Sequence, residues 1–69
     1  MVEVFKTNVT NSSAASEITA DLYRLFPKGR INFDLEDCDK ILRVETEELV
    51  PEKITGILQC RGFLCEVLE

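Results

Sequence analysis

Histidine is absent from the chain, and this absence restricts the chemistry available to the protein. Without a histidine, no serine or cysteine side chain has an evident general base that would activate it as a nucleophile. Glycine is also scarce, and the three glycines form no glycine-rich phosphate-binding loop. We therefore expect a protein that is not an enzyme.

Basic clusters and long apolar runs are missing as well. The eight lysines and arginines are scattered singly in a chain of net charge −5, so the averaged field repels nucleic acids and anionic membranes. No apolar run approaches the roughly 20 residues of a membrane span, and the N-terminus lacks the basic-then-apolar pattern of a secretory signal. We expect a cytoplasmic protein that binds neither nucleic acid nor membrane, and whose partner is another protein or a second copy of itself.

The composition that remains is typical of one globular domain covering residues 1–69, because 45% of the residues are hydrophobic and 30% are charged. Alternation of apolar and polar residues predicts four strands, at residues 2–6, 30–35, 40–45 and 63–68. Apolar residues at intervals of three and four predict two helices. The first helix ends at Pro27, and the second begins near Pro51 and ends at Gly62.

The order strand, helix, strand, strand, helix, strand is that of the ferredoxin-like βαββαβ sandwich, an α+β fold. Right-handed crossovers place the first and third strands in the centre of a four-stranded antiparallel sheet with the order 4-1-3-2. Both helices then lie on one face of this sheet. We expect the other face to be open.

The open face is the most informative feature for function. The strand pattern predicts that Phe5, Ile41, Leu64 and Leu68 face outward, whereas alternate residues face the helices. The inward set is Val2, Val4, Ile31, Phe33, Leu42, Val44, Cys65 and Val67. Large apolar residues side by side on a solvated face indicate an interaction site. A thin domain that is unable to bury all its apolar groups is the alternative interpretation, and the sequence leaves both open.

The loop-to-helix junction after the first strand and the pair Gly62-Phe63 resemble the heavy-metal-associated domain of copper chaperones and metal-pumping ATPases. In that family the loop carries Met-x-Cys-x-x-Cys, whose thiolates bind a soft cation such as Cu(I). Here Val9 takes the Met position, and Asn11 and Ala14 take the two Cys positions. The resemblance therefore implies the scaffold without the metal-binding loop. The residues that carry the scaffold are Ile18, Leu22, Ile54, Ile57 and Leu58.

The loop residues also have a structural interpretation. Asn11, Ser12 or Ser13 is suited to capping the first helix, and this explains the polar loop more simply than an anion site does.

The cysteines offer the remaining route to a metal. Three cysteines at irregular spacing suit a reducing compartment rather than a disulfide framework. Cys60 and Cys65 flank a glycine turn, so a divergent Cu(I) or Zn(II) site formed by these two residues is the alternative function. The simpler interpretation makes Cys65 a small buried apolar residue and places Cys60 at the edge of the helix stripe. Cys38 is predicted to be an exposed thiol.

An acidic run follows the second strand at Asp34, Glu36, Asp37 and Asp39. It lacks the glycine and the terminal glutamate of an EF-hand loop, and alternate carboxylates on a hairpin point to opposite faces. We interpret it as a solvated turn that discourages edge-to-edge pairing of sheets.

Overall fold

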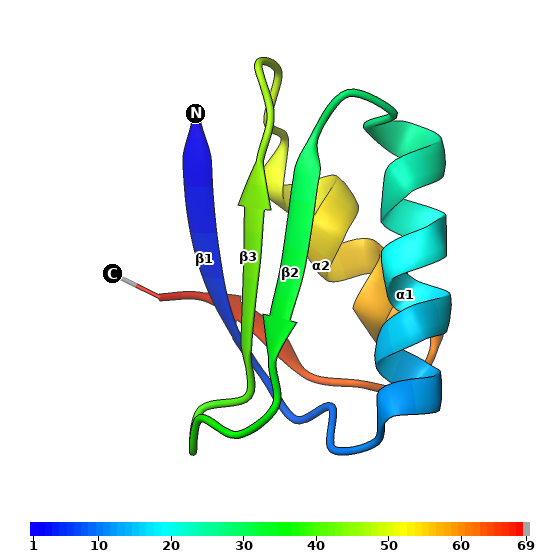
Figure 1. Ribbon diagram of the computed structural model, residues 1–69, viewed down its shortest axis with the longest axis vertical. Helices are drawn as coiled ribbons and strands as arrows, with labels where there is room; N and C mark the ends of the chain where they lie inside the picture. The colour runs from blue at the N-terminus through cyan, green and yellow to red at the C-terminus, as the bar shows by residue number, and fades with distance from the viewer. Residues whose placement is uncertain (69) are drawn as a thin grey trace.

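The computed structural model describes residues 1–68, and its elements follow the order expected from the sequence (Figure 1). The strands are β1 (Val2–Thr7), β2 (Arg30–Asp34), β3 (Ile41–Glu45) and β4 (Cys65–Val67). The helices are α1 (Ser12–Leu25) and α2 (Pro51–Cys60). β4 is shorter than the strand predicted over residues 63–68, because Gly62 and the residues just after it form the connection from α2. No helix within residues 1–68 is long and apolar enough to cross a membrane.

The four strands form one antiparallel sheet in the order β2-β3-β1-β4. Counted from the β2 edge the order is 2-3-1-4, whereas the sequence prediction, 4-1-3-2, counts from the β4 edge. In both counts β1 lies between β3 and β4, and β3 lies between β2 and β1. The two edges of the sheet are therefore β2 and β4.

Local signals in the sequence determine where the helices begin and end. The side-chain Oδ1 of Asn11 accepts a hydrogen bond from the backbone N–H of Ala14 at 2.7 Å, so Asn11 is the residue that caps α1. Pro51 occupies the first turn of α2, where a backbone N–H would have no partner within the helix, so the lack of an N–H in proline costs no hydrogen bond. Gly62 follows α2 with a φ of +85°, a conformation that glycine adopts without strain.

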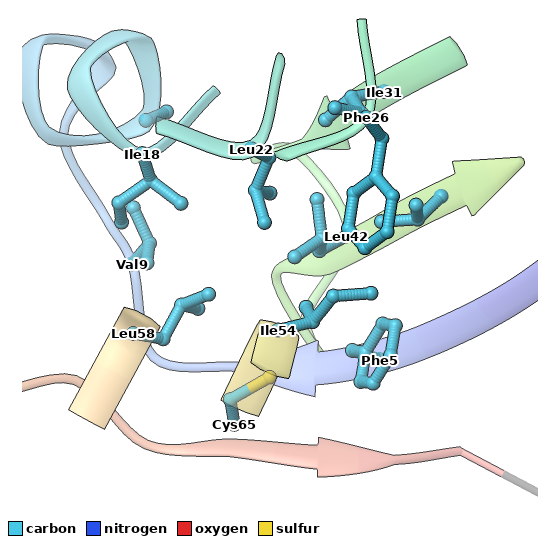
Figure 2. Close-up of a cluster of buried hydrophobic side chains, with 12 residues drawn as sticks. Phe5, Val9, Ile18, Leu22, Phe26, Ile31, Leu42, Ile54, Leu58 and Cys65 are labelled. Atoms are coloured by element: carbon cyan, nitrogen blue, oxygen red, sulfur yellow. The ribbon is translucent and has the colours of Figure 1, made fainter. Parts of the chain in front are cut away.

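One hydrophobic core lies between the sheet and the two helices, which cover the same face of the sheet (Figures 1 and 2). Leu42 and Val44 of β3 meet Ile18 and Leu22 of α1 and Ile54 of α2 in this core, and all five side chains are fully buried. Phe5 lies opposite Leu42 in the register and is also fully buried.

The orientation of β1 differs from the sequence prediction. We expected Phe5 on the open face and Val2 and Val4 toward the helices, and this expectation was wrong. Because β1 carries apolar residues on both faces, alternation alone does not decide between them. Phe5 fills more of the core than a valine does, and Thr7, which shares its face and is also buried, forms hydrogen bonds with Lys40 and Val9. Val2 is 46% exposed as a result.

The outward orientation predicted for Ile41, Leu64 and Leu68 agrees better with the structure than that of Phe5 does. Leu64 is 67% exposed and Leu68 is 40% exposed, while Ile41 is half-buried on the face away from the helices. Val67 was predicted to face the core, yet it is 39% exposed. It lies opposite Phe5 on the helix side of the sheet, but it belongs to the edge strand and stands outside the core cluster.

Candidate functional site

The loop between β1 and α1 is held by its own side chains. Val9, which takes the methionine position in the resemblance to heavy-metal-associated domains, is fully buried in the core. The Thr7 hydroxyl donates a hydrogen bond to the backbone carbonyl of Lys40 at 2.6 Å and accepts one from the N–H of Val9 at 3.2 Å. Asn8 Oδ1 accepts a hydrogen bond from the N–H of Leu64 at 2.7 Å. This loop thereby joins the β2–β3 hairpin and the segment before β4 at one end of the molecule.

The same loop does not fit a soft metal ion. Asn11 uses its side-chain oxygen to cap α1, and Ala14 has no donor atom and packs partly buried against the core. A soft cation prefers thiolate ligands, and neither of these positions supplies one. The loop is therefore a structural connection.

Cys60 and Cys65 differ in burial. Cys65 is 8% exposed and belongs to the core cluster, as Figure 2 shows, whereas Cys60 is exposed at the end of α2. Burial, together with the charge of Glu66, raises the pKa of the Cys65 thiol from 9.0 to about 11. A protonated thiol is a poor metal ligand, since the thiolate is the form that binds. Metal binding through these two residues stays a prediction.

Cys38 is exposed on the β2–β3 hairpin, as expected. Its sulfur and one carboxylate oxygen each from Asp37 and Asp39 lie within 4.8 Å of one another. Asp37 Oδ1 already accepts a hydrogen bond from the N–H of Asp39 at 2.9 Å, and Asp34 Oδ1 accepts from the N–H groups of Glu36 and Asp37. The acidic side chains thus shape the turn, which agrees with its interpretation as a structural feature.

The open face of the sheet carries an apolar patch that we define by five side chains. These are Val2, Val4, Ile41, Leu64 and Leu68. Phe5 leaves the predicted set, and two valines that the sequence assigned to the core enter it. The size of Phe5 was the one available signal that the valines face outward, because a larger side chain gains more from burial.

Charged residues divide this patch. Val4 lies beside Leu68, whose N–H donates a hydrogen bond to the Val4 carbonyl at 2.8 Å. Lys6 lies between Ile41 of β3 and Glu66 of β4 in the register. The apolar surface near Val4 is therefore separated from Ile41 by a lysine, and Leu64 and Leu68 flank a glutamate.

A shallow groove on the outer side of the helix layer was not foreseen. It has a volume of about 530 Å³ and its apolar lining comes mainly from Leu25, Gly56 and Ile57. At its end, the Arg61 guanidinium donates hydrogen bonds to Asp21 at 2.8 Å and to Glu17 at 3.1 Å, linking the two helices. The hydrogen bond to Asp21 raises the pKa of Arg61. Arg61 thus has a bridging role beyond the packing of its stem.

Comparison of the chain with protein-family models, with curated proteins and with solved structures gives no match.

Proposed function

We propose that the chain is a small non-enzymatic module, similar to heavy-metal-associated domains and ferredoxin-like in fold, that acts by binding another protein or a second copy through its open sheet face. The observation that carries this proposal is the apolar patch on the face that the helices leave uncovered. Val2, Leu64 and Leu68 are each exposed by two fifths or more. A loop whose side chains are used internally supports a role without the family's metal.

Charge favours another protein over a second copy. Each chain carries a net charge of −5, which produces repulsion between copies at low salt. A standard interface removes roughly 800 Å² from each partner, about a sixth of the 4557 Å² surface of this domain. A partner with basic side chains would lower the electrostatic cost of covering so large a fraction of an acidic surface.

Sedimentation equilibrium from micromolar to millimolar protein, at low and high salt, tests the arm in which a second copy is the partner. If copies associate through the open face, the apparent mass rises with concentration and salt, and Leu68→Asp returns it to the monomer value. Leu25→Asp is the matched control, because Leu25 is 45% exposed but lies on α1.

A strict monomer that Leu64→Asp leaves unchanged excludes self-association and leaves binding of another protein. Unfolding measurements on the same variants test the structural alternative. If Leu64→Asp and Leu68→Asp each cost as much stability as a core truncation, about 2 kcal/mol or more, the patch belongs to the fold and the proposal fails.

A further inference from the structure

The two edges of the sheet differ in how they are protected. At the β2 edge, the Tyr23 hydroxyl of α1 accepts a hydrogen bond from the outward N–H of Ile31 at 3.3 Å. Arg30 and Asp34 place charges at the two ends of that strand. A side chain that bonds to an outward backbone group of an edge strand hinders pairing with another chain, and so do charged residues along that strand.

The β4 edge is less protected, because its one charge is Glu66 at the centre of a three-residue strand. Leu68 donates to Val4, and Glu66 lies opposite Lys6, so the backbone groups of Cys65 and Val67 point away from β1 in the antiparallel ladder. Within residues 1–68 no side chain forms a hydrogen bond with these outward groups. Leu64 and Val67 are exposed on either side of Glu66. Two N–H groups and two carbonyls of this edge thus point away from β1, with Val67 39% exposed and Cys65 8% exposed.

We propose that the β4 edge binds an extended segment of another protein as an additional antiparallel strand, with a basic residue opposite Glu66 and an apolar residue two positions away on each side. This inference rests on the proposed function and specifies the chemistry of its partner. The outward groups of Cys65 and Val67 supply the main-chain hydrogen bonds, as in other strand-addition complexes. Leu68 continues the ladder beside Val4 on the face of Glu66, and strand alternation places Leu64 on that face as well, so the segment presents apolar, basic and apolar side chains in alternate positions.

The charge at Glu66 disfavours a second copy as the occupant. In the antiparallel register that pairs Leu64 with Leu68 of another copy, Glu66 lies directly opposite Glu66. Like charges in that position are destabilising, whereas a basic residue there is stabilising. The acidic chain as a whole adds long-range attraction for a basic segment.

The test uses a seven-residue peptide, blocked at both ends, in which valine, arginine and valine occupy alternate positions between threonines. Titration into the full chain, followed by amide NMR spectra and hydrogen exchange, is expected to shift and protect the N–H groups of Cys65 and Val67. Glu66→Lys is expected to weaken binding on the order of tenfold. It should also bind the peptide with glutamate in place of arginine more tightly than the wild type does. Glu45→Lys makes the same charge change on β3 and is expected to have little effect.

Val67→Pro isolates the edge itself. It removes an outward N–H that the sheet does not use, and proline is tolerated on edge strands in that position. Peptide binding should be lost while the amide spectrum of the core stays folded. A different result would overturn this inference while supporting the proposed use of the open face. In that result the peptide binds saturably and shifts Val2 and Ile41, Cys65 gains no protection from exchange, and Val67→Pro has no effect on binding. Absence of any binding by the peptide overturns the strand-addition proposal, and the sedimentation experiment then judges the open face independently.

Discussion

Truncating neighbouring residues of β1 tests the orientation on which the open face depends. Phe5 is fully buried in the core beside Leu42, as Figure 2 shows, whereas Val4 is half-buried on the opposite face. Phe→Ala in a core costs about 3–5 kcal/mol, because a cavity remains where the ring was. A half-buried Val→Ala costs about 1 kcal/mol, in proportion to the apolar area that it returns to water.

These magnitudes are large compared with the stability of so small a domain. At roughly 0.05–0.15 kcal/mol per residue, a domain of this length has about 3–10 kcal/mol, so Phe5→Ala removes much of the total. Urea unfolding followed by far-UV circular dichroism measures both variants, with a slope of about 1–3 kcal/mol per molar urea. We expect Phe5→Ala to lower the midpoint by more than about 1 M or to unfold the protein outright, and Val4→Ala to lower it by less.

Phe5→Leu keeps most of the core volume and guards against complete unfolding, with an expected cost of about 1–2 kcal/mol. The decisive comparison is between Phe5→Asp and Val4→Asp. Aspartate at position 5 buries a charge and should prevent folding, whereas aspartate at position 4 points toward solvent. If the Val4 variants are the more damaging pair, β1 has the opposite orientation, and the apolar patch defined above does not exist.

Three further predictions concern the cap, a buried thiol and a helix glycine. Asn11→Ala is expected to cost about 1 kcal/mol in thermal unfolding, and Ser12→Ala to cost less, because Asn11 alone supplies the cap bond to α1. Burial raises the pKa of the Cys65 thiol from 9.0 to about 11, so the thiol of the unfolded chain loses its proton at a lower pH than that of the folded chain. About 2–3 kcal/mol of the folding stability present below pH 9 is therefore lost as the pH rises to 11. In urea titrations at several pH values, Cys65→Ala should remove this part of the pH dependence. Gly56→Ala should stabilise by about 0.5–1 kcal/mol, because its new Cβ meets nothing within 4 Å, whereas Gly62→Ala should lower the melting temperature because of its positive φ.

The elements could be predicted from the sequence because their signals are local. Pro51 and Gly62 bracket α2, and the alternation Ile31, Phe33 marks β2. The α+β class and the positions of the two central strands follow from the order of these elements and from the handedness of crossovers. Among the capping candidates, the choice of Asn11 depends on backbone geometry at the start of α1, and residue types alone do not predict that geometry.

Orientation within β1 and the grouping of the cysteines were harder, because both depend on tertiary packing. Val2, Val4 and Phe5 are all suited to a core, so the pairing of Phe5 with Leu42 decides which face each takes. Cys60 and Cys65 are close in sequence, but one follows a helix stripe and the other follows a strand. Proximity along the chain therefore did not give the two thiols the same environment, because Cys60 is exposed and Cys65 is buried.

The hydrogen bond between Asn8 and Leu64 connects the loop to the strand edge that we assign to partner binding. A loop that held a metal would need ligand atoms free to converge on the ion, whereas the polar atoms of Asn8 and Asn11 are used within the fold. The bond at 2.7 Å fixes the chain immediately before β4, so the short strand is ordered before any partner arrives. Ordering an edge in advance reduces the entropy that binding must overcome. The Asn8 side chain thus orders the edge at which we propose main-chain recognition.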